Sequence, residues 1–139
     1  MGHAFEGHLD EIFRLHGLRF QQGRGKGLTT ENNSRPDFIF PGFAEYRDSE
    51  FPAEKLFMLG AKTTCKDRWR QVLSEAHRIP QKHLVTMEVA ISESQTMEMQ
   101  SHGLQLVVPQ KIQMTYSDSQ RSWLMALEGF IDITKKHCC

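Results

Sequence analysis

Two short apolar runs decide the fold of this chain. They read Arg35-Pro36-Asp37-Phe38-Ile39-Phe40 and Leu56-Phe57-Met58-Leu59-Gly60-Ala61-Lys62. Both runs have the length and the composition of buried strands, so we predict two adjacent strands over 36–41 and 56–62. Asp37 opens the first run and Lys62 ends the second, which places both side chains at strand ends, where they can converge.

A second carboxylate follows these strands. Glu75 lies on a helix that we predict over 66–78, at the border of its apolar face, so we expect it to point toward the sheet edge that carries Asp37 and Lys62. Two carboxylates and a lysine are the side chains that a magnesium-dependent phosphodiesterase needs. The carboxylates bind a hard cation through oxygen, and the lysine stabilises the phosphate and the attacking water.

Each carboxylate also has a plainer interpretation, as a surface acid paired with a nearby base. Considered together, Asp37 and Glu75 favour the functional interpretation because strand and helix bring them to one edge. Glu6 lies on a helix that we predict over 4–16, next to its buried face. For Glu6 the sequence leaves metal binding and a surface ion pair equally open.

A basic segment follows Lys62. Lys66, Asp67 and Arg68 form a donor, acceptor, donor series, and Arg70 extends the positive charge. Lysine and arginine pair with guanine, and aspartate accepts from cytosine N4, so this series is able to read adjacent G·C pairs. The alternative is a solvated helix face, which composition alone favours. Positive residues at a helix N-terminus oppose the helix dipole, however, which favours a role outside the helix itself.

The order of predicted elements indicates an α/β fold. Strands are also predicted over 83–89 and 104–108, and a final helix begins with capping-box spacing near Ser117 and continues to Ile131. Strands interrupted by helices predict a mixed sheet with helices packed on it.

Composition places the chain among ordinary globular proteins. It has 139 residues, of which 39% are hydrophobic and 24% charged, and its formal net charge is zero. This length predicts one domain. No apolar run is long enough to span a membrane, the N-terminus is too polar for a signal peptide, and three cysteines without Cys-x-x-Cys spacing suggest neither a disulfide framework nor a zinc site. We therefore expect a cytoplasmic protein.

Four stretches carry a resemblance to a known family; they are 35–42, 59–73, 82–84 and 91–96. Together they resemble the catalytic domain of EcoRII-type restriction endonucleases. The resemblance implies a PD-(D/E)xK nuclease fold, a mixed sheet flanked by helices, acting as a homodimer on duplex DNA. It also implies Mg²⁺-dependent hydrolysis at a CCWGG-like sequence that leaves a 5′-phosphate.

The resemblance assigns roles by position. It implies Asp37, Glu75 and Glu6 as Mg²⁺ ligands, Asp37, Lys62, Glu75 and Tyr46 as catalytic residues, and Lys66, Asp67 and Arg68, beside Arg70, as DNA-binding residues. One position departs from the general nuclease pattern, because Gly60 stands where an acid usually precedes the lysine by two residues. The family moves that carboxylate to the following helix, where Glu75 fits.

We expect residues 1–139 to form a single catalytic domain without the N-terminal effector domain of the family. Two alternatives to an active restriction enzyme stay open. One is a non-catalytic remnant that still binds its DNA sequence, and the other is a structure-specific repair nuclease of the same fold.

Overall fold

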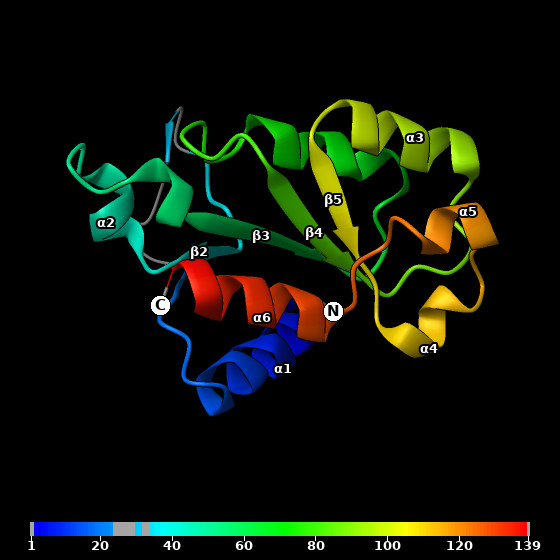
Figure 1. Cartoon of the computed structure of the whole chain (residues 1–139), viewed down its shortest axis with the longest axis horizontal. Coiled ribbons are helices and arrows are strands. Elements are labelled where there is room, and N and C mark those ends of the chain that lie inside the picture. The colour runs from blue at the N-terminus through cyan, green and yellow to red at the C-terminus, as the bar shows by residue number, and fades with distance from the viewer. Residues whose placement is uncertain (1, 24–29, 32–33, 139) are drawn as a thin grey trace.

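The chain folds around a five-stranded mixed sheet with helices on both faces (Figure 1). The computed structural model describes residues 2–23, 30–31 and 34–138. The strands lie in the order β1-β2-β3-β4-β5; they are β1 (Gln21–Gln22), β2 (Phe38–Phe40), β3 (Phe57–Lys62), β4 (Lys82–Thr86) and β5 (Leu104–Val107). The predicted α/β class with a mixed sheet is confirmed.

The strand pairing changes from antiparallel to parallel at β3. On one side β3 pairs antiparallel with β2, with Phe38 opposite Leu59, and β2 pairs antiparallel with β1. On the other side β3 pairs parallel with β4, with Lys62 opposite Thr86, and β4 pairs parallel with β5. Lys62, at the end of the central strand β3, therefore lies beside the start of β2.

Two helices, α1 (Gly2–Leu15) and α6 (Leu127–His137), cover one face of the sheet (Figure 1). Their apolar side chains meet alternate residues of the strands, and the resulting core contains Leu9, Phe13, Phe38, Phe40, Leu59, Val85, Val107, Phe130 and Ile131. Phe13 lies at its centre, edge-to-face against Phe38 and Phe40 with ring centroids 5.3 and 5.4 Å apart. Aromatic pairs of this geometry add to the stabilisation from burial alone.

The remaining elements belong to the opposite face and the connections. They are α2 (Phe43–Arg47), the 3₁₀ helices η2 (Ala53–Lys55) and η3 (Lys66–Ser74), α3 (Glu93–Ser101), α4 (Gln110–Gln113) and α5 (Asp118–Arg121). A second core lies under η3 and α3, where Trp69, Val72 and Met99 pack on Met58 and Leu84. The two cores follow from the period-two alternation of the strands.

Several predicted elements differ from the structure. Residues 66–78 do not form one α-helix, because η3 is a 3₁₀ helix that ends at Ser74. The predicted final helix is broken between α5 and α6, because Met125 forms an isolated parallel β-bridge with Val107. The backbone N–H of Met125 donates to the carbonyl of Leu106, and its carbonyl accepts from the N–H of Val108. The capping box at Ser117 is confirmed, with Gln120 as its partner.

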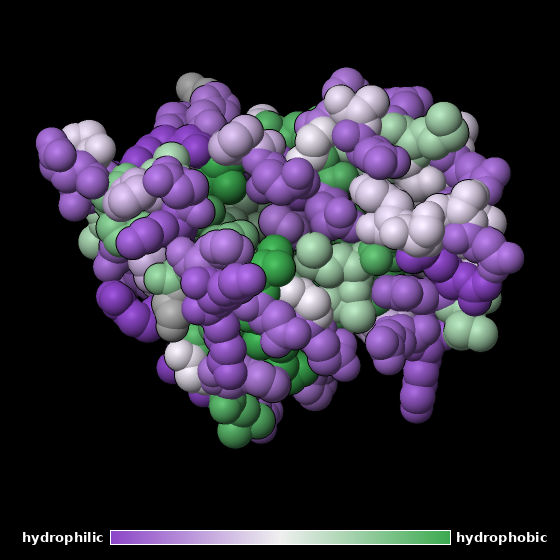
Figure 2. Space-filling view, viewed as in Figure 1, coloured by the Kyte–Doolittle hydropathy of each residue, from purple (hydrophilic) through white to green (hydrophobic). Residues whose placement is uncertain are grey.

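The surface view shows where polar and apolar side chains gather on one face of the molecule. The face drawn in Figure 2 is mostly hydrophilic, with apolar side chains gathered near its middle and at its lower edge, over α1. Among the described helices, none combines the length and the apolar character that crossing a bilayer requires.

The aromatic core generates the first prediction. Phe13 is fully buried, so we expect Phe13→Ala to lower the free energy of unfolding by about 3–5 kcal/mol, through lost burial and the cavity left behind. Leu15→Ala on the same helix is the matched control, because Leu15 is 79% exposed and its loss should cost at most about 0.5 kcal/mol. Urea denaturation of both variants measures the difference. Equal midpoints would show that α1 does not contribute to the core as described.

A candidate active site where β2, β3 and η3 meet

Asp37, Lys62 and Glu75 come from three neighbouring elements. Asp37 directly precedes β2, Lys62 is the last residue of β3, and Glu75 directly follows η3. Antiparallel pairing brings the start of β2 beside the end of β3. Side chains alternate between the two faces of a strand, so Asp37 is on the same face as Ile39, and Lys62 is on the same face as Met58. Ile39 and Met58 are opposite each other, and both belong to the face that η3 covers.

The Glu75 carboxylate is largely withdrawn from water. Burial, and to a lesser extent the nearby Asp37 charge, raise its pKa to about 8, although the charges of Lys62 and Lys82 act in the opposite direction. Its Oε1 atom is buried and has no hydrogen-bond partner among the described residues. These electrostatic effects come from Asp37 and Lys62, so the two carboxylates and the lysine lie near one another. An unpartnered carboxylate oxygen next to a second carboxylate is the environment that a divalent cation would neutralise.

Asp37 is held in place by the neighbouring strand. Its Oδ2 atom accepts a hydrogen bond of 2.7 Å from the backbone N–H of Ala61, the residue before Lys62. This bond fixes the carboxylate relative to the end of β3, so Asp37 and Lys62 are positioned by the same pair of strands.

The sequence predicts that Glu75 lies on a helix, but in the structure it lies just beyond the end of η3. It is an extended residue (φ −95°, ψ 151°), and Ala76 after it takes a positive φ of 49°. The turn that follows is fixed by outside groups: the backbone N–H of Ala76 donates to Thr30 Oγ1 at 3.1 Å and that of His77 to Glu31 Oε1 at 3.2 Å. Glu75 is therefore directed by the tertiary structure rather than by helix geometry.

Lys82 is a residue of this site that sequence reasoning missed. It is 5% exposed, and its Nζ donates to the carbonyl oxygens of Ala76 at 2.8 Å and Ile79 at 2.5 Å. Burial lowers the pKa of Lys82, while the Glu75 charge raises it. The available signal was a lysine at the start of an otherwise apolar strand.

Tyr46 belongs to the same turn. Its hydroxyl donates to Glu31 Oε1 at 2.5 Å and accepts from the backbone N–H of Arg78 at 3.1 Å. The Arg78 guanidinium in turn donates to backbone carbonyls of α2 and the segment after it, among them that of Phe51 at 2.7 Å. These contacts place the Tyr46 hydroxyl at the turn after Glu75, where it braces the backbone.

Glu6 is not gathered with the other two carboxylates. It lies half-buried on α1, whose apolar side packs on the sheet face opposite η3. In the described parts of the chain, no three carboxylate, histidine or cysteine side chains form a group able to hold a metal ion. A role for Glu6 as a ligand stays a prediction, and Asp37 with Glu75 forms the carboxylate pair.

Steric crowding accounts for Gly60 at the position, two residues before Lys62, where the general nuclease pattern has an acid. A Cβ atom at Gly60 would lie 3.1 Å from Val72 Cγ2 and 3.2 Å from Leu84 Cδ1. These distances are shorter than ordinary van der Waals contacts, so β3 has little room for a side chain here. A side chain at position 60 would therefore require Val72 and Leu84 to move by a few tenths of an ångström, whereas the second carboxylate of this site comes from position 75.

The predicted DNA-binding residues lie on η3. Lys66, Arg68 and Arg70 are exposed, whereas the side chain of Asp67 lies outside the described part of the structure. Arg70 forms an ion pair with Glu98 of α3 and stacks on Trp69, 4.5 Å from its ring centroid. The basic segment is thus solvent-accessible and begins four residues after Lys62.

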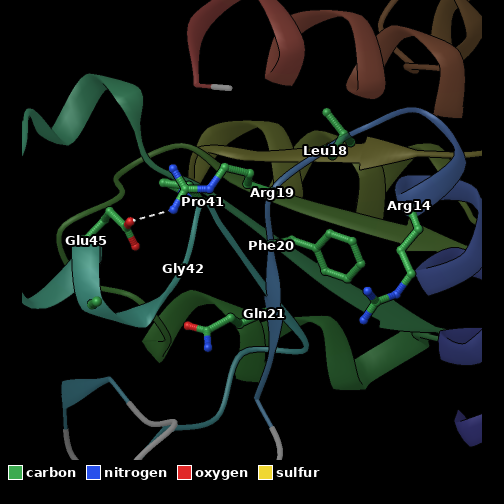
Figure 3. Close-up of a pocket in the computed structure, with 9 residues that line it drawn as sticks. Arg14, Leu18, Arg19, Phe20, Gln21, Pro41, Gly42 and Glu45 are labelled. Carbon is green, nitrogen blue, oxygen red and sulfur yellow. Dashed lines mark hydrogen bonds and ion pairs between the residues drawn. The ribbon is translucent and has the colours of Figure 1, made fainter.

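A cavity lies away from this junction. It has a volume of about 460 Å³ and is found beyond the opposite end of β2, beside Pro41 and Gly42 (Figure 3). Two arginines line it, but Arg14 is paired with Asp10 and Arg19 with Glu45. Because these guanidinium groups already have carboxylate partners, the chemistry points to the junction of Asp37, Lys62 and Glu75 instead.

The mixed sheet and the helices that cover it place the chain in the restriction-endonuclease-like fold class. More narrowly, it belongs to the family described as EcoRII C terminal, whose profile matches residues 1–131. It is 46% identical over 130 residues to the type II restriction enzyme EcoRII of Escherichia coli, a match that covers 94% of this chain and 31% of that enzyme. The chain therefore spans about a third of the length of this curated relative.

Solved structures show the same fold. Metal-depleted Ecl18kI in complex with uncleaved, modified DNA superposes with a TM-score of 0.79 at 19% identity, covering 97% of this chain and 44% of that one. The PspGI–substrate DNA complex gives a TM-score of 0.72 at 15% identity, covering 98% of this chain and 60% of that one. The likeness confirms the restriction-endonuclease fold predicted from the resemblance.

The raised pKa of Glu75 predicts an unusual pH dependence. The carboxyl has a pKa near 4.5 when solvated and about 8 in the folded protein, so the folded state holds the extra proton between these values. Without metal, stability should be fully present below pH 4.5 and fall as pH rises toward 8. Glu75→Gln should remove this slope and be more stable than the parent at pH 8 by a few kcal/mol.

Denaturant unfolding in EDTA at pH 5 and pH 8 measures this effect. Glu54→Gln is the control, because Glu54 is an exposed acid on η2 and its replacement should leave the slope unchanged. Parallel pH profiles for Glu75→Gln and the parent would contradict the burial described for Glu75.

Proposed function

We propose that this chain is the catalytic core of a type II restriction endonuclease. It would hydrolyse phosphodiester bonds of duplex DNA at a CCWGG-like sequence in the cytoplasm, with Mg²⁺, and leave 5′-phosphates. The observation that carries the proposal is the convergence of Asp37 and Glu75 on Lys62, with one buried Glu75 oxygen left unpartnered. Membership of the EcoRII C-terminal family supports DNA as the substrate.

The carboxylate pair fits Mg²⁺. This ion typically takes one or two protein carboxylates and completes its coordination with water and substrate phosphate oxygens, and Asp37 and Glu75 provide such a pair. When bound, Mg²⁺ would supply positive charge at the scissile phosphate and lower the pKa of a water molecule. Asp37 would act as a ligand through the carboxylate that the Ala61 N–H holds beside β3, and Glu75 would enter the site as the ionised carboxylate.

Lys62 supplies the remaining charge. Its ammonium group, at the end of β3, would donate to a phosphate oxygen and orient the attacking water on the side of the carboxylates. Lys82 and Tyr46 would act through the turn after Glu75, because their contacts are with its backbone.

Recognition of the sequence is assigned to the start of η3. Lys66 and Arg68 would donate to guanine, and Asp67 would accept from cytosine N4, in the major groove. Arg70 would add positive charge toward the phosphate backbone. Two such sites, one for each strand, would cut both strands in a single binding event, so we propose that a homodimer is the active form.

Cleavage is tested by digesting plasmid DNA that carries CCWGG sites, with Mg²⁺ and with EDTA, and mapping the ends. We expect metal-dependent cutting at those sites, and we expect Lys62→Ala to reduce it by about 10²-fold or more while DNA binding is kept. Lys55→Ala is the matched control, since Lys55 is an exposed lysine on η2, just before β3.

Other outcomes would replace the proposal. A folded protein that shifts the same DNA in a gel but never cuts it would be a sequence-specific binding module. Cutting that depends on a mismatch or a branch would identify a structure-specific repair nuclease. Near-normal turnover by Lys62→Ala would remove the role given to that residue.

Metal binding has a readout that is independent of cleavage. Mg²⁺ should raise the thermal midpoint of the parent protein more at pH 8 than at pH 6, because only ionised Glu75 binds it. Glu75→Gln should lose most of this stabilisation, whereas Glu54→Gln should keep it. An equal Mg²⁺ response in all three proteins would place the metal elsewhere.

A further inference from the structure

The side chain of Glu88 hydrogen-bonds to the backbone between Lys62, the candidate catalytic lysine, and the residues proposed to read DNA. Residues 63–65 connect β3 to η3. The Oε1 atom of Glu88, which lies just after β4, accepts hydrogen bonds from the backbone N–H groups of Cys65 at 2.6 Å and Lys66 at 3.1 Å. Nearby, Thr86 Oγ1 donates to the Thr63 carbonyl at 3.3 Å. The connection is thereby attached to the end of the neighbouring parallel strand.

Glu88 takes the place of a local helix cap. The first N–H groups of a helix have no partner within it, and the residue that precedes η3, Cys65, provides no side-chain cap. The Cys65 side chain is instead fully buried. A carboxylate at this position also interacts favourably with the positive end of the helix dipole, and hydrogen bonds to an ionised acceptor are stronger than neutral ones.

Glu88 is itself held on both sides. Its backbone N–H donates to Thr86 Oγ1 at 3.1 Å, and its carbonyl oxygen accepts from the Tyr116 hydroxyl at 2.6 Å. Two residues later, the backbone N–H of Ala90 donates to Thr115 Oγ1 at 3.0 Å. A side chain with so fixed a backbone is able to hold another segment in one position.

We propose that Glu88 is a positioning residue for sequence recognition. It sets the backbone at Cys65 and Lys66, so that the side chains of Lys66 and Arg68 meet the base edges in a fixed register relative to Lys62. Glu88 acts through this segment and does not itself contact DNA. The inference rests on the proposed function, because it assumes that the start of η3 reads DNA.

Two substitutions separate position from charge. Glu88→Gln and Glu88→Ala both remove the negative charge, and with it the same repulsion of DNA, but only glutamine keeps an oxygen that accepts from the two N–H groups. Binding is measured in EDTA to a duplex with CCWGG and to one with a single C·G pair replaced. We expect Glu88→Ala to lose about tenfold of the discrimination between them and Glu88→Gln to retain most of it.

Turnover gives a second readout. If Glu88 acts through recognition, Glu88→Ala should raise KM for the CCWGG duplex about tenfold and change kcat much less. Glu93→Ala is the matched control: Glu93 also accepts two hydrogen bonds, from the hydroxyls of Ser117 at 2.7 Å and Ser119 at 2.9 Å, but holds a different part of the chain. Its discrimination should equal that of the parent.

The outcomes are distinguishable. A parent protein that does not discriminate between the two duplexes would overturn the proposed function and this inference with it. A discriminating parent with an equally discriminating Glu88→Ala would overturn the inference alone. If Glu88→Ala does not fold, Tyr116→Phe releases the Glu88 carbonyl and keeps the ring, and it should lower discrimination in the same direction; unchanged discrimination in Tyr116→Phe would also overturn the inference.

Discussion

The burial of the Glu75 carboxylate next to Asp37 is the constraint on which the site depends. Withdrawing an ionised carboxylate from water costs several kcal/mol, and a like charge adds to that cost. The arrangement persists because its surroundings are fixed independently. Asp37 is held by the β2–β3 pair, and the turn after Glu75 is held by Lys82 and by the hydroxyl of Tyr46. Glu75 therefore keeps its proton up to a pKa of about 8, and a cation that binds both carboxylates would favour its ionised form.

The position of β3 joins chemistry to recognition. This strand is antiparallel to β2 and parallel to β4, so its last residue, Lys62, lies where the start of one neighbour meets the end of the other. The chain then passes directly into η3 through a connection held by Glu88. Few bonds separate the group assigned to the phosphate from the groups assigned to the bases. A short and fastened connection of this kind would define the cut position relative to the sequence read.

Local sequence patterns predicted the parts of this fold that depend on local periodicity. The amphipathic helix near the N-terminus and the strands before Glu75 were found because apolar spacing is a local property, and strand ends were enough to bring Asp37 to Lys62. The 3₁₀ form of η3 and the break at Met125 were missed, since both are imposed by packing on the sheet. Lys82 and Glu88 were missed for a related reason: their partners are backbone groups of other segments, and no spacing pattern records such contacts.

Gly60 connects the packing of η3 to the source of the second carboxylate. The space in which a side chain at this position would begin is narrowed by Val72 and Leu84, with Cβ distances of 3.1 and 3.2 Å. An acid at position 60 would therefore require both side chains to move by a few tenths of an ångström. A carboxylate at position 75 makes no such demand, so the close packing of η3 on β3 and a carboxylate beside Lys62 are compatible in one structure.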